Sequence, residues 1–242
     1  MAGKTTLSAN VARVRERMAA AATRARRDPK DVRLVAVTKG LPDAAVLAAI
    51  ELGEMDLGES RVQDLLPRVA VVSDFLTRRS AGLQPTVRWH MIGHLQRNKV
   101  RPLVSAVTMV HSVDTLRLAE AIDQAAGKFG RKMPVLLEVN CSDEPAKFGV
   151  AVGAVECLVE QIATLGNIEL RGLMTMASRV DQAEQARGCF ARLREIFEDV
   201  ARSRRAGPNF VDLSMGMSQD FEVAIEEGAT LVRVGSAIFD GV

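Results

Sequence analysis

Residues 33–51, RLVAVTKGLPDAAVLAAIE, place a short apolar strand, a turn and a helical pattern one after another. Side chains alternate along a strand, so Val35, Val37 and Lys39 share one of its faces. The turn at residues 40–42 contains glycine and proline, which end the strand before the helical pattern begins. A strand followed directly by a helix is the repeating unit of α/β proteins. This stretch therefore predicts an α/β fold, with a lysine where its first strand ends.

The same strand-then-helix pattern recurs eight times along the chain. The expected strands span residues 34–38, 55–57, 87–92, 107–110, 135–140, 170–174, 210–213 and 230–234. The helical patterns that follow them span residues 43–52, 61–76, 96–103, 114–126, 152–165, 181–205, 219–227 and 236–239. Eight units in 242 residues predict a closed (β/α)8 TIM barrel, although an open doubly wound sheet uses the same alternation. A further helix over residues 7–27 precedes the first strand, and we expect one domain over residues 1–242.

The composition is that of an ordinary soluble protein, with 48% hydrophobic and 26% charged residues. A net charge of +2 gives no reason to expect nucleic acid or a membrane surface as a partner. The N-terminus lacks the apolar segment of a signal peptide, and no apolar run is long enough to span a bilayer. Cys141, Cys157 and Cys189 are too widely spaced to predict a disulfide framework or a zinc site. We therefore expect a cytoplasmic protein without a bound metal ion.

Residues suited to binding or catalysis gather where the expected strands end. They are Lys39, Glu59, Ser60, Arg61, His90, His94, His111, Ser112, Asn140, Met174, Thr175, Ser214, Met215, Gly216, Arg233, Gly235 and Ser236. One polar strand end is routine, whereas eight in succession are not. Because the active sites of barrels lie at the carboxyl ends of the strands, these residues predict a single site.

The last expected strand carries Arg233 between two apolar neighbours. Val232 and Val234 can pack outward against helices, so Arg233 points into the barrel, where a guanidinium group needs a partner. The pair Gly235–Ser236 opens a helix, and its N–H groups and hydroxyl can bind an anion. Together with the loop 214–218 it predicts the phosphate cup that barrels place after strands seven and eight. Each loop by itself also fits a simple tight turn.

Lys39 faces the same interior from the first strand. Partial burial near Arg233 would lower the pKa of its ammonium group and provide a free amine for Schiff-base chemistry. A lysine, an inward arginine and a phosphate cup together suit pyridoxal 5′-phosphate. On these grounds a Schiff-base aldolase and a non-catalytic barrel remain open as alternatives.

Seven longer motifs run in order from about Arg33 to Asp240. They are LVAVTKG, LGESRVQDLL, WHMIGHLQRNK, HSVDTLRLAEAID, VLLEVNCSDEPAKFGV, LRGLMTMA and LSMGMSQDFEVAIEEGATLVRVGSAIFD. In this order they resemble the pyridoxal phosphate homeostasis protein family. The resemblance implies a barrel of the alanine racemase type, fold type III of the pyridoxal phosphate proteins, with the cofactor held as an aldimine on Lys39.

The resemblance also implies which residues bind the cofactor. They are Lys39, Ser60, His90, Asn140, Met174, Ser214, Met215, Gly216, Arg233, Gly235 and Ser236. Ser214, Gly235 and Ser236 would hold the phosphate, assisted by the backbone of Met215 or Gly216, and Arg233 would face the pyridine nitrogen. His90, Asn140 and Met174 would line the ring pocket. Ser60 stands where the family usually has asparagine, which puts the contact of that asparagine in doubt, and no residue is assigned a catalytic role.

The sequence favours a carrier over an enzyme. Racemases of the related fold use a tyrosine as their second base, and this chain contains no tyrosine. They also have a second, β-rich domain, for which no residues remain here. Arg233 stays protonated and hardly protonates the pyridine nitrogen, which weakens the ring as an electron sink. We expect a monomeric, non-enzymatic protein that buffers pyridoxal phosphate and interacts with apoenzymes and free amino acids. The alternative is a slow pyridoxal-phosphate-dependent amino-acid racemase.

Overall fold

A computed structural model of the chain describes residues 2–79, 86–142, 144, 147–178 and 180–242. Its strands are β1 (Arg33–Val37), β2 (Asp56–Glu59), β3 (Arg88–Met91), β4 (Met109–Val113), β5 (Met133–Asn140), β6 (Val150–Ala151), β7 (Ile168–Met174), β8 (Asp212–Ser214) and β9 (Leu231–Val234). Neighbouring strands pair in parallel, and the pairing of β4 with β5 closes eight of them into a ring, while β6 lies beside β5. The expected closed barrel is confirmed, and the open-sheet alternative is wrong.

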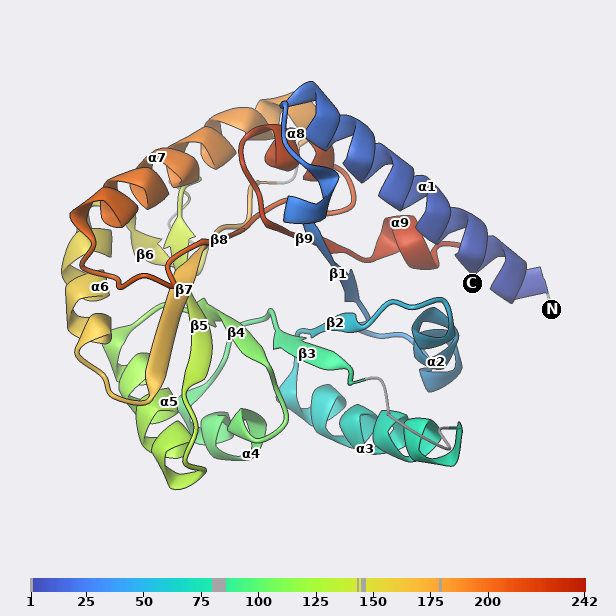
Figure 1. Ribbon diagram of the computed structural model, residues 1–242, viewed down its shortest axis with the longest axis horizontal. Coiled ribbons are helices and arrows are strands. Elements are labelled where there is room, and N and C mark those ends of the chain that lie inside the picture. The colour runs from blue at the N-terminus through green and yellow to red at the C-terminus, as the bar shows by residue number, and fades with distance from the viewer. Residues whose placement is uncertain (1, 80–85, 143, 145–146, 179) are drawn as a thin grey trace.

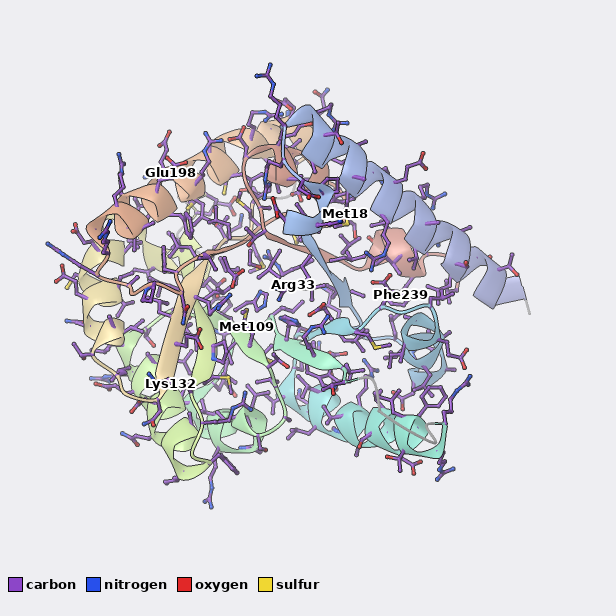
Figure 2. The ribbon with its side chains drawn as sticks, viewed as in Figure 1. Met18, Arg33, Met109, Lys132, Glu198 and Phe239 are labelled. Carbon is purple, nitrogen blue, oxygen red and sulfur yellow. The ribbon has the colours of Figure 1, made fainter. Side chains whose placement is uncertain are left out.

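The inside of the barrel and the layer outside it hold different side chains. Val35, Met109, Leu136, Met174 and Leu231 form a small apolar cluster inside the ring, where Figure 2 labels Met109. The alternate residues of β9, Val232 and Val234, belong instead to the large core between strands and helices, as expected. Because the inner cluster is so small, polar side chains fill much of the remaining interior.

Helices surround the barrel as an outer layer (Figure 1). They are α1 (Ala2–Arg24), α2 (Asp43–Glu51), α3 (Val62–Arg79), α4 (Val100–Val104), α5 (Leu116–Lys128), α6 (Val155–Ala163), α7 (Arg187–Ser203), α8 (Phe221–Glu226) and α9 (Ser236–Phe239). Short 3-10 turns at Pro29–Asp31, Arg97–Lys99, Val152–Ala154 and Ala183–Ala186 lead into β1, α4, α6 and α7. Among the described residues, no helix combines the length and the apolar character that crossing a membrane requires.

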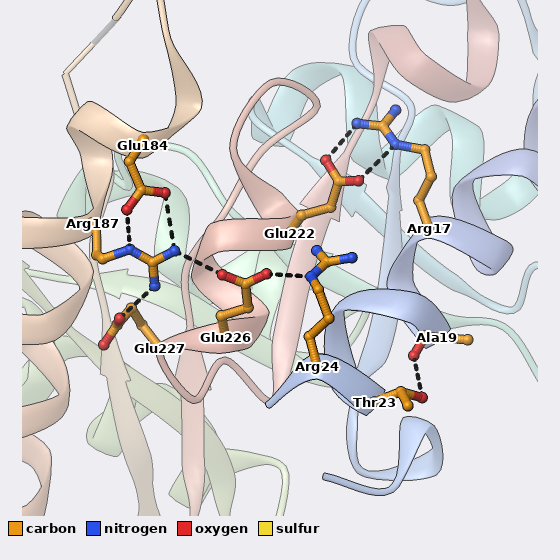
Figure 3. Close-up of polar contacts among 9 residues, drawn as sticks. All are labelled: Arg17, Ala19, Thr23, Arg24, Glu184, Arg187, Glu222, Glu226 and Glu227. Atoms are coloured by element: carbon orange, nitrogen blue, oxygen red, sulfur yellow. Dashed lines mark hydrogen bonds and ion pairs between the residues drawn. The ribbon is translucent and has the colours of Figure 1, made fainter. Parts of the chain in front are cut away.

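Helix α1 lies across the outside of the barrel, against α8 and α9 (Figure 1). Ion pairs join its polar face to α8: Arg17 binds Glu222 at 2.7 Å, and Arg24 binds Glu226 at 2.8 Å. Arg187 of α7 binds the same Glu226 at 2.7 Å, so the pairs form a network over three helices (Figure 3). We call these residues the α1 ion pairs.

Several boundaries differ from those expected. β4 extends to Val113, so His111 and Ser112 lie within the strand rather than after it. Their polar side chains do not end the strand because both are buried and hydrogen-bonded, as described below. α1 ends at Arg24, since Arg26 adopts the left-handed conformation with φ of 57°. The short strand β6 was not expected.

Candidate functional site

Lys39 lies two residues beyond the end of β1, at the carboxyl-end mouth of the barrel. The residue is exposed, so the expected partial burial is wrong. Arg68 of α3 holds the turn around it: Nη1 donates to Thr38 O at 2.7 Å, and Nη2 donates to Leu41 O at 2.5 Å. Arg68 is itself buried. It therefore fixes the backbone on both sides of Lys39 while the lysine stays accessible.

A buried carboxylate completes this arrangement. Glu59, at the end of β2, forms an ion pair with Arg68 and accepts a hydrogen bond from Thr38 Oγ1 at 2.9 Å. Asp43 Oδ1 binds Arg68 Nε at 3.1 Å. A buried guanidinium is stable only when such acceptors satisfy its donors. We call Thr38, Glu59 and Arg68 the Lys39 clamp.

A chain of buried side chains runs through the barrel interior. Arg233 Nη1 donates to Ser214 Oγ at 2.6 Å, and Ser214 Oγ lies 2.9 Å from His111 Nδ1. His111 Nε2 lies 2.9 Å from His90 Nδ1, and His90 Nε2 lies 3.0 Å from Asp56 Oδ1. None of the five residues is more than 6% exposed. We call these five residues the interior chain.

The charged groups at the two ends of the interior chain fix the hydrogen bonds that they make themselves. The carboxylate of Asp56 can only accept, so His90 donates from Nε2, and Arg233 can only donate, so the oxygen of Ser214 accepts from it. Between them, a neutral His111 ring donates from one nitrogen and accepts at the other. Burial, His90 and Arg233 hold the pKa of His111 well below its usual range, which keeps this ring neutral. The tautomer of His111 therefore sets the direction of the two hydrogen bonds in the middle of the interior chain.

An arginine stands at each end of the interior chain. Arg88 Nε and Nη2 bind Asp56 Oδ1 and Oδ2 at 2.7 and 2.5 Å, and although burial opposes the effect, the hydrogen bonds hold the pKa of Asp56 well below its usual range. At the other end Arg233 Nη2 donates to Thr175 O at 2.9 Å. Burial lowers the pKa of Arg233 to about 10, so it is still protonated at neutral pH. Arg233 is a cation held in one position.

The two loops expected to bind phosphate lie together. Ser218 Oγ accepts hydrogen bonds from the backbone N–H groups of Gly235 at 3.1 Å and Ala237 at 3.3 Å. One oxygen atom thus occupies the point on which these donors converge, and Ser236 between them is exposed. Gly216 has φ of 91°, and a Cβ there would lie 2.6 Å from a side chain of α8, so the turn requires glycine. The geometry suits an anionic oxygen.

The other expected residues lie at different depths. Met174 belongs to the apolar cluster inside the ring, and the buried Met215 uses its N–H group to bind Leu231 O at 3.1 Å. Asn140 is half-buried and donates to Glu144 O at 2.8 Å, within its own loop. The structure therefore brings one group of expected residues to the mouth and buries a second group beneath it. At the mouth are Lys39, Ser60, Asn140, Gly235 and Ser236; beneath it are His90, Met174, Ser214, Met215, Gly216 and Arg233.

Glu138 of β5 is a buried carboxyl group that sequence reasoning missed. It faces the interior, because Leu136 two positions earlier belongs to the inner cluster, and it is 2% exposed. Burial, together with Asp114, raises the pKa of Glu138 to about 7, although Arg233 opposes this. Its carboxyl group has no hydrogen-bond or ion-pair partner among the residues that the structure describes. Glu138 can therefore gain or lose a proton near neutral pH.

Asp56 and Arg68 were missed as well. A lone charged residue in an apolar strand, as in VLLEVN, is the signal that could have identified Glu138. Asp56 is the first residue of its strand, and a charged residue at that position is ordinarily exposed to solvent. Arg68 gave no signal, since it is one of many arginines within helical patterns.

Comparison with known proteins first defines a class. Residues 7–241 match the family model of the alanine racemase N-terminal domain. Alanine racemase from Corynebacterium glutamicum is 13% identical and superposes with a TM-score of 0.69 over 99% of this chain and 63% of that one, which shows the fold alone. The class is a parallel barrel of the alanine racemase N-terminal type.

More similar relatives narrow the class. The pyridoxal phosphate homeostasis protein of Pseudomonas aeruginosa is 38% identical over 97% of this chain and 95% of its own length, and that of Aquifex aeolicus is 36% identical over 95% of each. The structure of PipY from Synechococcus elongatus PCC7942 with PLP bound is 31% identical, with a TM-score of 0.82 over 96% of this chain and 99% of that one. The chain belongs to the pyridoxal phosphate homeostasis protein family.

Proposed function

We propose that the protein binds pyridoxal 5′-phosphate at the carboxyl-end mouth of the barrel and buffers and supplies it within the cell. The observation that carries the proposal is Lys39, an exposed amine on a turn that the Lys39 clamp holds still. The family name of the relatives and the PLP bound to PipY support it. In this proposal Lys39 forms a Schiff base with the cofactor's aldehyde, which supplies the carbonyl carbon that a primary amine attacks.

The residues at the mouth fit this cofactor. The N–H groups of Gly235 and Ala237, which converge on Ser218, offer donors to the phosphate. Ser236 and the backbone of Gly216 lie in the same two loops and complete the proposed phosphate site. Arg233 presents a fixed cation to the pyridine nitrogen. Ser214 acts there by fixing Arg233, since its hydroxyl already bridges Arg233 and His111. The remaining proposed pocket residues are Ser60, His90, Asn140, Met174 and Met215.

We further propose that the protein holds the cofactor without efficient catalysis. The chain has no tyrosine to serve as a second base. Arg233 donates a hydrogen bond but keeps its proton, so the pyridine ring stays a weak electron sink. The carrier acts as a cytoplasmic monomer and exchanges cofactor with apoenzymes and free amino acids. A slow racemase is the alternative, and rapid exchange of amino-acid α-protons in deuterium oxide would favour it.

The test is the absorption spectrum of the protein loaded with pyridoxal phosphate, before and after borohydride reduction. We expect a band near about 420 nm, typical of a protonated Schiff base, and a reduced adduct located on Lys39 by mass spectrometry. Lys39→Ala should lose the band and the adduct while the fold is retained. Lys30→Ala, which removes an exposed lysine ahead of β1, is the matched control and should keep both. A band that persists in Lys39→Ala would place the attachment on another lysine.

A further inference from the structure

Cys141 and Cys189 stand 48 positions apart in the sequence and meet beside the candidate site. Cys141 follows β5 and is buried, whereas Cys189 lies in the first turn of α7 and is half-buried. Both are free thiols, and each side chain lies close enough to shift the pKa of the other. Thr175 Oγ1, just beyond β7, lies 3.9 Å from Cys189 Sγ. Three segments of the chain thus converge on one pair of sulfur atoms.

Backbone hydrogen bonds hold these segments in place. Val139 O accepts from Thr175 Oγ1 at 2.8 Å and from the N–H group of Cys141 at 3.2 Å. The carbonyl of the same Thr175 accepts from Arg233 Nη2 at 2.9 Å. Thr175 therefore links the thiol pair to Arg233, the residue at one end of the interior chain.

The two thiols differ in their surroundings. The neighbouring thiol of Cys141, together with Thr175 and the positive charge of Lys147, lowers the pKa of Cys189. The neighbouring thiol of Cys189 and burial raise the pKa of Cys141. A thiolate, not a thiol, attacks a disulfide. Cys189 is both the more acidic and the more accessible, which makes it the attacking thiol and Cys141 the resolving one.

We propose that Cys141 and Cys189 form a redox-active dithiol that low-molecular-weight disulfides convert into an intramolecular disulfide. The Cys189 thiolate attacks one sulfur of the reagent, breaks its S–S bond and releases one thiolate, leaving a mixed disulfide. Cys141 then loses its proton to solvent and attacks Cys189 Sγ, which forms the protein disulfide and releases the second thiolate. The protein gives up two electrons, and the reagent is reduced to two thiols.

The test equilibrates the full chain in buffers of reduced and oxidised glutathione, quenches with acid, alkylates and locates the labels by mass spectrometry. In oxidising buffer we expect the loss of two hydrogen atoms and a cross-linked peptide pair containing Cys141 and Cys189. The exposed Cys157 provides the matched control, since Cys157→Ser should leave the cross-link unchanged. Cys189→Ser should abolish it and leave Cys141 unmodified.

Glutathione attached to Cys189 with no cross-link at equilibrium would overturn the proposal, as would full alkylation of both cysteines in the most oxidising buffer. Because Cys141 is buried, the Cys189 variant carries the test, and circular dichroism confirms that each variant is folded. The chemistry does not involve pyridoxal phosphate, so the outcome stands apart from the fate of the proposed function.

Discussion

The interior chain and the α1 ion pairs are built from similar groups, yet burial separates them. Members of the interior chain are at most 6% exposed, whereas the side chains of Arg17 and Arg24 are 38% and 54% exposed. An exposed ion pair gains little free energy compared with the hydration of its two separate charges, and salt screens the attraction between them. Inside the barrel, each polar group has only its neighbours in place of water, so the loss of one leaves the others unsatisfied.

The two regions also do different work in the molecule. The α1 ion pairs attach an extra helix to the outside of a barrel that is already closed. The interior chain fixes Arg233 at the candidate site through partners that begin at Asp56, the first residue of β2. The position of Arg233 therefore depends on residues far from the mouth. Removing one group at a time from either region separates the two contributions.

The largest effect is expected for Asp56→Ala. The substitution leaves the buried His90 without the carboxylate that its Nε2 binds, and the half-exposed Arg88 without its ion pair. Breaking a buried pair such as that of His90 costs about 3–5 kcal/mol of unfolding free energy. Urea denaturation followed by circular dichroism measures the loss. Asp199→Ala, at an exposed carboxylate of α7, is the matched control and should leave the transition midpoint nearly unchanged. Equal midpoints for the two variants would show that water replaces the buried carboxylate without cost.

The next effect is a pH dependence created by Glu138. In the folded chain it holds its proton up to about pH 7, whereas its usual pKa is 4.5, so between these values the folded state binds more protons. Stability from this group therefore falls as the pH rises through that window. The unfolding free energy of the wild type, minus that of Glu138→Gln, should fall by about 1.4 kcal/mol per pH unit there. Urea titrations at several pH values measure this difference.

A second group titrates in part of the same window, and the subtraction removes it. His111 is neutral in the folded chain, so below its usual pKa of 6.5 the unfolded state binds more protons and stability rises with pH. This slope is opposite in sign to that of Glu138 and is present in both proteins. A difference curve that stays flat from pH 4.5 to 7 would show that Glu138 is ionised throughout.

A smaller effect is expected for Ser214→Ala, which removes the middle of the interior chain. His111 Nδ1 loses its hydrogen-bond partner and Arg233 loses one acceptor, and each buried group left unsatisfied costs about 1–3 kcal/mol. The ¹⁵N shift of His111 Nδ1 should also change, because this nitrogen loses its hydrogen bond. Ser105→Ala, at an exposed serine, is the control and should alter neither value. An unchanged His111 shift would show that Ser214 does not bind this ring.

Most of the fold could be predicted because the periodicity is strong. In the units at residues 33–51 and 229–239, strand and helix follow each other with glycine at the boundary, and the observed elements match. The predicted end of β4 lies three residues too early, because the polar residues His111 and Ser112 resemble the end of a strand. Their burial follows from partners on other strands, which a local pattern does not contain.

The candidate site could be predicted in part, because some of its residues interrupt the apolar pattern of a strand. Lys39, Arg233 and Gly235 stand out because each breaks an apolar strand where it ends. The role of Arg68 in the clamp depends on how distant segments pack, and so does the proximity of Cys141 to Cys189. No spacing in the sequence predicts either of them. Burial was misjudged at Lys39, because strand alternation gives direction but not depth.

The smallest effect is expected for Arg24→Ala, which removes one of the α1 ion pairs. Glu226 keeps Arg187 as a partner at 2.7 Å, and Arg24 is half exposed, so the loss should be about 0.2–1 kcal/mol. Because salt screens exposed charges, the difference from the wild type should shrink further in about 1 M sodium chloride. Asp56→Ala should keep most of its loss at high salt, since the side chain of its partner His90 is 1% exposed, although that of Arg88 is 46% exposed. Urea titrations of both variants at low and high salt make the measurement. A loss in Arg24→Ala that equals that of Asp56→Ala and resists salt would mean that α1 is integral to the barrel, and that burial is not what separates the two regions.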